Sequence, residues 1–123
     1  MVSESFSCFE NKNTKAMNHI SCEELKRKFD LKDRFKLVNA LDEERFRALH
    51  IPGSINICRD EDIQKCLGLD DVIIVYCTDE ACNRSILLYQ QLEAFGYEKI
   101  FRFAGGLRAW ESAGYELVGE MAA

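Results

Sequence analysis

Residues 72–77, which read VIIVYC, constrain the fold more strongly than any other part of this sequence. From Val72 to Tyr76 the run is apolar at every position and rich in β-branched residues. A strand of this kind is typical of a parallel sheet, because helices cover both of its faces and no position needs to face water. We therefore expect a buried parallel strand here, with Cys77 directly beyond its carboxyl end.

The rest of the chain alternates between strand and helix patterns. Further strands are expected at 36–41, 54–57 and 99–103, and helices at 21–30, 42–49, 61–68, 84–95 and 107–114. Ser21 and Glu24 fit a capping box at the first helix start. Leu88, Leu92 and Phe95 share one face of a later helix. The alternation predicts an α/β fold in which helices flank a central, mainly parallel sheet.

Length and charge narrow the class of protein. The 123 residues predict one domain at 18–118, with a flexible tail at 1–17 and a short C-terminal tail at 119–123. Neither a membrane-length apolar run nor a secretory leader is recognisable, so we expect a cytoplasmic protein. The net charge of -5 argues against nucleic acid or an anionic membrane surface as partner. The cysteine and histidine spacings do not fit a structural zinc site, so neither a metal nor another cofactor is expected.

The loop that follows Cys77 has the features of an anion site. Ligands of open parallel sheets bind beyond the carboxyl ends of the strands. The helix that begins near Arg84 directs its free N–H groups and positive dipole end toward the loop, and this field lowers the pKa of a cysteine. Arg84 offers a planar fork for an oxyanion, and Ser85 offers a hydroxyl. The segment alone equally fits a buried structural thiol at Cys77 and a surface charge at Arg84.

Three motifs, in this order along the chain, resemble those of the rhodanese family. The first is His-Ile-Pro-Gly-Ser-Ile-Asn at 50–56. The second is Val-Tyr-Cys at 75–77, followed by Asn-Arg-Ser at 83–85. The third is Gly-Gly-Leu at 105–107, with Trp110 and Gly114 after it. The chain is similar to single-domain members of the family over about residues 18–118, and the ordered set is more specific than any one motif.

The resemblance implies a three-layer fold and a sulfur-transfer reaction. In this reaction Cys77 attacks a sulfane sulfur, becomes a persulfide, and passes the sulfur to a thiol or another nucleophile. The donor would be a small thiosulfate-like compound or a persulfidated protein. The anion-binding loop would consist of Thr78, Asp79, Glu80, Ala81, Cys82, Asn83, Arg84 and Ser85.

The loop departs from the family pattern in length and charge. Six residues separate Cys77 from Arg84, where family sulfurtransferases usually have four and related phosphatases and arsenate reductases have five. Asp79 and Glu80 would repel a dianion, which argues against a phosphatase and favours a persulfidated protein or thiol as donor. The usual Asp-Val-Arg before the first motif is replaced by Asn-Ala-Leu at 39–41. Cys58 stands where the family often has proline.

Four functions remain to be distinguished. The leading hypothesis is a sulfurtransferase or sulfur carrier that uses Cys77. A noncatalytic interaction module is an alternative, although such modules usually lack the cysteine. A thiol redox protein would use Cys82 as a resolving thiol against Cys77, whereas the simpler interpretation of Cys82 is a small residue at a position where many relatives have glycine. A phosphatase or arsenate reductase is the fourth.

Residues outside the loop are expected to support the structure. We expect His50 to fix a turn through a hydrogen bond, and Trp110 to pack the last helix onto the sheet. The pair Gly105-Gly106 should permit a tight turn close to the loop. Arg102 and Arg108 are expected at solvated surface positions.

Overall fold

The computed structural model describes residues 17–121. Within them the helices are α1 (Cys22–Asp30), α2 (Glu43–Ala48), α3 (Asp60–Cys66), α4 (Arg84–Ala94) and α5 (Gly106–Ser112). The strands are β1 (Lys36–Asn39), β2 (Ile55–Asn56), β3 (Ile73–Tyr76) and β4 (Ile100–Phe103). The predicted N-terminal tail lies outside the described residues except for Met17, and so do the last two residues of the predicted C-terminal tail.

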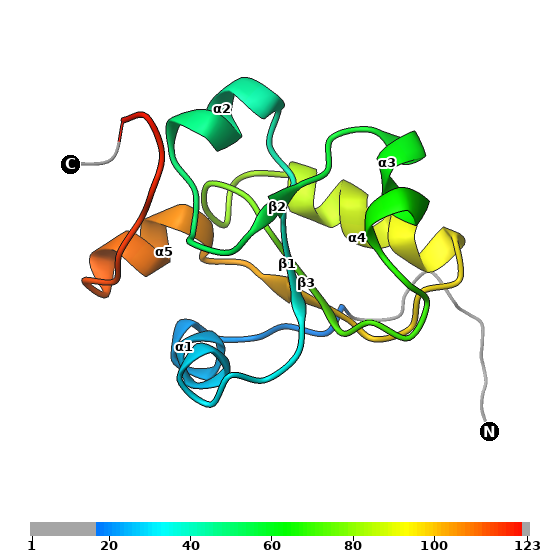
Figure 1. The fold of residues 1–123 in the computed structure, drawn as a ribbon, viewed down its shortest axis with the longest axis horizontal. Helices are drawn as coiled ribbons and strands as arrows, with labels where there is room; N and C mark the ends of the chain where they lie inside the picture. Colours follow the sequence, from blue (N-terminus) through cyan, green and yellow to red (C-terminus); the bar gives the residue numbers. More distant parts are fainter. Residues whose placement is uncertain (1–16, 122–123) are drawn as a thin grey trace.

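The four strands form one parallel sheet in the order β2-β1-β3-β4. Every side chain of β3 is fully buried, as expected for a strand covered on both faces. Figure 1 shows α1 and α5 on one side of the sheet and α3 and α4 on the other, with α2 beyond its upper end. The predicted α/β fold, with a parallel sheet flanked by helices, is confirmed.

The elements predicted at 36–41 and 61–68 each end two residues earlier than expected. The strand predicted at 36–41 ends at Asn39, because the Asn39 Oδ1 atom accepts a hydrogen bond from the Leu41 amide at 2.8 Å and bends the chain. The helix predicted to run to Gly68 ends at Cys66, where Leu67 adopts an extended conformation. Leu67 is buried, so the chain leaves the helix in order to place this side chain in the core.

The apolar face of α4 is shorter than the sequence predicts. Of the three residues predicted to share one face, Leu88 and Leu92 are buried, whereas Phe95 is 38% exposed. Phe95 caps the carboxyl end of α4, and Gly96 follows with a φ of 97°. This left-handed turn redirects the chain, and Tyr97 enters the core instead.

The start of α1 and the packing of α5 follow the sequence prediction. The Ser21 hydroxyl accepts the Glu24 amide at 3.1 Å, and the Glu24 carboxylate accepts the Ser21 amide at 2.9 Å, which completes the capping box. Trp110 of α5 is buried, with its ring centroid 5.4 Å from that of Phe29 and 6.4 Å from that of Phe103. Trp110 therefore packs α5 against both α1 and the sheet.

The end of the described chain contacts α2. The amides of Glu120 and Met121 donate to the carbonyls of Arg47 and Ala48 at 2.9 Å each. The described part of the predicted C-terminal tail is thus hydrogen-bonded to a helix. Among residues 17–121, no helix combines the length and the hydrophobicity that a bilayer crossing needs.

Candidate functional site

The structure brings three of the predicted site residues together at the carboxyl end of β3. Cys77 follows the last residue of the strand and is only 1% exposed. Its Sγ atom lies 3.4 Å from the Ser85 hydroxyl oxygen and 3.5 Å from the Cys82 carbonyl oxygen. Ser85 belongs to the first turn of α4 and is 1% exposed. Cys77, Cys82 and Ser85 therefore form one compact cluster at the sheet edge.

Asp79 organises the long loop between Cys77 and α4. Its carboxylate accepts the Ala81 amide at 3.1 Å, and its carbonyl accepts the Cys82 amide at 3.1 Å. This is a side-chain-supported turn of the kind that aspartate favours. The Oδ2 atom also lies 3.6 Å from the Arg108 Nε atom. The extra length of the loop is thus folded on itself, and Asp79 is paired with an arginine.

The start of α5 is hydrogen-bonded to the same loop. The Leu107 amide donates to the Cys77 carbonyl at 3.0 Å, and the Arg108 amide donates to the Thr78 carbonyl at 2.9 Å. Gly106 has a φ of 59°, and a Cβ atom built on it would lie 2.3 Å from the Cys77 carbonyl oxygen. The predicted tight turn of Gly105-Gly106 against the loop is confirmed, and Gly106 is the residue that makes the close approach.

The pKa directions of the two cysteines differ from the sequence expectation. Burial raises the pKa of Cys77, and hydrogen bonds from the Ser85 hydroxyl and amide only partly oppose this effect. Partial burial also disfavours the Cys82 thiolate, but the Cys77 thiol and the amides of Arg84 and Thr78 donate to it and lower its pKa. The expectation that the helix end gives Cys77 a lowered pKa is wrong, because the burial of the thiol outweighs the hydrogen bonds from Ser85 at the start of α4.

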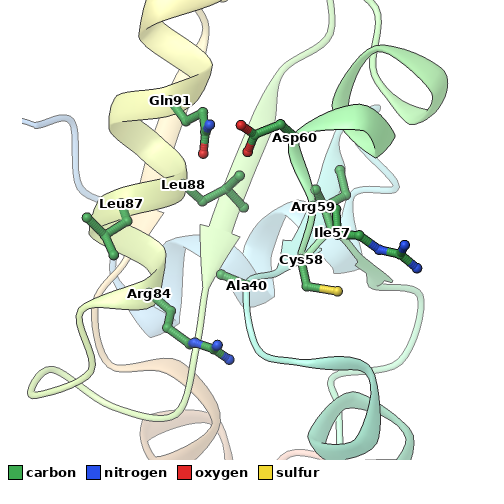
Figure 2. Close-up of a pocket in the computed structure, with 9 residues that line it drawn as sticks. All are labelled: Ala40, Ile57, Cys58, Arg59, Asp60, Arg84, Leu87, Leu88 and Gln91. Carbon is green, nitrogen blue, oxygen red and sulfur yellow. The ribbon is translucent and has the colours of Figure 1, made fainter.

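The Cys77 thiol has its hydrogen-bond partners in Cys82 and Ser85, and the Arg84 side chain is paired with another residue. The Arg84 side chain is 47% exposed, and its Nη1 atom lies 3.6 Å from the Oδ2 atom of Asp42. Arg84 lines one end of a cavity of about 180 Å³ between α4 and residues 57–60 (Figure 2). Cys58 lines the same cavity. The role of Arg84 as a residue that holds an anion beside Cys77 stays a prediction.

Arg102 is buried, so the prediction of a solvated surface position is wrong. The side chain is 7% exposed, and its Nε atom donates to the Ser85 hydroxyl oxygen at 2.9 Å. The outer edge of β4 is covered, because the Ile20 amide donates to the Arg102 carbonyl and the Arg102 amide donates to the Asn18 carbonyl. Successive side chains of a strand point to opposite faces of the sheet, so Arg102 of β4 faces away from its neighbours Phe101 and Phe103. It lies on the face that α4 covers. Arg108, by contrast, is 73% exposed, as predicted.

Tyr76 fixes the segment at 50–56 to the end of β3, a contact that the sequence patterns did not predict. Its hydroxyl accepts the Ile51 amide at 3.1 Å and lies 2.8 Å from the Ser54 hydroxyl oxygen. A tyrosine that ends an otherwise aliphatic buried strand needs a hydrogen-bond partner, and this was the available signal. His50 has its Nδ1 atom 2.7 Å from the Phe46 carbonyl, so its side chain contacts α2, and its role in fixing the following turn stays a prediction.

The remaining cysteines do not join this cluster. All five cysteines in the described part of the chain are free thiols, and Cys58 and Cys66 are exposed. Within residues 17–121, no three histidine, cysteine, aspartate or glutamate side chains gather as ligands of a metal ion would.

Comparison with known proteins gives one consistent family. The description "Rhodanese-like domain" matches residues 21–113. The chain is 23% identical over 100 residues to "Putative sulfur carrier protein YrkF" of Bacillus subtilis (strain 168). That alignment covers 81% of this chain and 54% of the relative, so the chain spans about half the length of the curated relative it matches.

Solved structures share the fold. A protein from Bacillus halodurans superposes with a TM-score of 0.79 at 25% identity, and the match covers 85% of this chain and 79% of that one. A thiosulfate sulfurtransferase from Pseudomonas aeruginosa superposes with a TM-score of 0.73 at 21% identity, over 84% of this chain and 20% of that one. The parallel sheet and its flanking helices thus form a fold that this chain shares with these proteins.

Proposed function

Because the chain belongs to the rhodanese-like domain family, we propose that it is a cytoplasmic sulfurtransferase or sulfur carrier that uses Cys77. The observation that carries this proposal is the cluster at the end of β3, where the Cys77 Sγ atom lies 3.4 Å from the Ser85 hydroxyl at the start of α4. The match to a relative named as a sulfur carrier supports the same class of reaction. The domain at 18–118 would be the working unit.

The reaction has two steps without net oxidation of the protein. The Cys77 thiolate attacks the outer sulfur of a sulfane-sulfur donor, the bond between the two donor sulfurs breaks, and the donor leaves as a thiolate or sulfite. A thiol acceptor then gives up its proton and attacks the outer sulfur of the Cys77 persulfide. This second step returns Cys77 to its thiolate form, so each turnover moves one sulfur atom.

The loop at 78–85 binds the anionic groups of this reaction in the proposed mechanism. The backbone amides of residues 78–84, apart from those of Ala81 and Cys82 that donate to Asp79, stabilise the thiolate, the persulfide and the donor, as amides at a helix start do for other anions. Since Cys77 is 1% exposed, the loop has to open before a donor reaches the thiol. Glu80 and Ala81 are exposed, and the Asp79–Arg108 pair that holds the loop is a weak surface contact.

The two acidic residues of the loop, Asp79 and Glu80, affect which sulfur donor the site favours. Asp79 lies beside Arg108, whereas Glu80 is exposed and has no ion pair among the described residues. The exposed carboxylate of Glu80, in the loop that covers Cys77, repels a small dianion such as thiosulfate. It repels a donor protein with a neutral or positively charged surface much less. A persulfidated protein or a persulfidated thiol is therefore the proposed donor, with a thiosulfate-like compound as the weaker one.

A thiol redox cycle is the second candidate, and one contact favours it. The thiols of Cys77 and Cys82 interact, and the pKa of Cys82 is the lower of the two. A Cys82 thiolate that attacks the inner sulfur of a Cys77 persulfide would expel hydrosulfide and form a disulfide, so the electrons balance without another oxidant. A dithiol reductant would then be needed for the next turnover.

Intact-mass measurement with a persulfide donor separates these functions. Sulfur transfer predicts the gain of one sulfur atom in the parent protein and in Cys82→Ser, and no gain in Cys77→Ser. The redox cycle predicts instead the loss of two hydrogen atoms, which requires both cysteines. Cys58→Ser is the matched control, because Cys58 is an exposed thiol outside the cluster. An adduct that persists in Cys77→Ser contradicts the proposed function.

A further inference from the structure

Arg102 is a buried cation that has no negatively charged partner among residues 17–121. The side chain is 7% exposed, and none of the ion pairs between described residues includes it. Its Nη2 atom is buried and has no hydrogen-bond partner among these residues. A guanidinium does not lose its proton at any physiological pH, so the charge persists in the interior. A buried charge of this kind is costly unless a nearby group can become an anion.

One chain of hydrogen bonds leads from this charge to the thiol. The Arg102 Nε atom donates to the Ser85 hydroxyl oxygen at 2.9 Å, and this oxygen lies 3.4 Å from the Cys77 Sγ atom. Both Ser85 and Cys77 are 1% exposed, so water screens this path poorly. When Cys77 is a neutral thiol, its S–H group donates to the same oxygen.

We propose that Arg102 is a positioning residue that stabilises the Cys77 anion through Ser85. The Arg102 N–H group occupies one lone pair of the Ser85 oxygen and fixes the hydroxyl beside the sulfur. Once Cys77 loses its proton, the hydroxyl hydrogen turns to the sulfur and donates to it. The guanidinium polarises this bond and supplies the compensating charge for a thiolate or a persulfide anion.

The other charged groups around Cys77 are less suited to this role. In the loop these are Asp79, Glu80 and Cys82, and on the two neighbouring helices they are Arg84 and Arg108. The two arginines are 47% and 73% exposed and each has a carboxylate partner. The loop groups are negative or become so, and they oppose a second anion. Arg102 is therefore the buried positive charge that favours ionisation of Cys77.

The inference rests on the proposed function only in that Cys77 reacts as an anion. Its test is the pH dependence of Cys77 alkylation by iodoacetamide, measured in a Cys82→Ser parent with the adduct mapped to Cys77. This readout needs no sulfur donor. A protein in which Cys77 titrates as described but takes up no sulfur would refute the proposed function and leave the role of Arg102 intact.

The decisive variant is Arg102→Met, which keeps an unbranched apolar stem and removes the charge. Loss of an opposite charge at this range raises a pKa by about one unit or more, so alkylation at neutral pH should slow about tenfold. Arg102→Lys should restore most of the rate, because it keeps the charge. Arg47→Met is the control, since it removes an exposed arginine of α2 whose ion pair is with Glu43, outside the loop, and should change the rate less than about twofold.

Ser85→Ala tests the path itself. Ser85→Ala should raise the pKa of Cys77. In the Ser85→Ala background, Arg102→Met should raise this pKa by less than it does in the parent protein. If Arg102→Met does not fold, the pH dependence of Cys77 alkylation in Ser85→Ala and in Arg102→Lys still tests the proposal. An unchanged Cys77 profile in Ser85→Ala, or equal effects of Arg102→Met with and without Ser85, overturns the proposal.

Discussion

Gly106→Ala tests whether the start of α5 holds the Cys77 loop in place. The added methyl group would lie 2.3 Å from the Cys77 carbonyl oxygen and 2.8 Å from the carbonyl carbon and oxygen of Thr78. These are backbone atoms, so relief requires that the loop or the helix moves. Such a movement stretches the Leu107 and Arg108 hydrogen bonds that join α5 to the loop.

The structure gives the size of the effect and a matched control. Gly106 has a φ of 59°, and a left-handed conformation costs an alanine about 1–2 kcal/mol. The overlap with backbone adds about 1–3 kcal/mol, as overpacking does elsewhere. Gly114 has a φ of 86°, but a methyl group added there would have nothing within 4 Å, so Gly114→Ala should show the conformational cost alone.

Urea unfolding, followed by the fluorescence of the single tryptophan, measures both variants. Trp110 is 4% exposed in the native protein and becomes fully exposed on unfolding. We expect Gly106→Ala to lose about 1–3 kcal/mol more free energy of unfolding than Gly114→Ala, and to alkylate faster at Cys77 under native conditions. Equal losses in the two variants, with unchanged Cys77 reactivity, would refute the close approach of α5 to the loop.

Two further predictions concern stability. Burial raises the pKa of Tyr76, so its contribution is fully present below about pH 10 and is lost as pH rises through the folded pKa. Tyr76→Phe should cost about 1–3 kcal/mol near neutral pH, because the Ile51 amide loses its partner, and should weaken the alkaline loss seen in urea midpoints measured on both sides of pH 10. Ser21→Ala should cost about 1 kcal/mol by removing the cap that accepts the Glu24 amide, whereas Ser21→Asp should cost much less, as thermal unfolding would report.

The features that the sequence predicts well depend on local patterns. The run from Val72 to Tyr76 identifies a buried central strand, because its side chains leave no solvent-facing position. Ser21 and Glu24 identify the start of α1, because both capping contacts span three residues. The pair Gly105-Gly106 predicts a tight turn, because glycine accepts the left-handed conformation that Gly106 adopts. The resemblance to the family places this turn close to the Cys77 loop.

The features that the sequence missed depend on contacts between distant segments. Arg102 and Ser85 are seventeen residues apart, and only the packing of α4 on β4 shows that the arginine is buried. The bond from Ile51 to Tyr76 spans twenty-five residues in the same way. The pKa directions of Cys77 and Cys82 depend on how the six loop residues fold, and a motif spacing does not specify that conformation.

The most direct test of the proposed function is the location of the transferred sulfur. After reaction with a persulfidated thiol, the protein is trapped with an alkylating reagent and digested, and the peptide that contains both Cys77 and Cys82 is fragmented in a mass spectrometer. We expect one additional sulfur atom on Cys77, and its disappearance when a thiol acceptor is added before trapping. Sulfur found on Cys82 alone, or a Cys77 adduct that an acceptor does not remove, would contradict the proposed function.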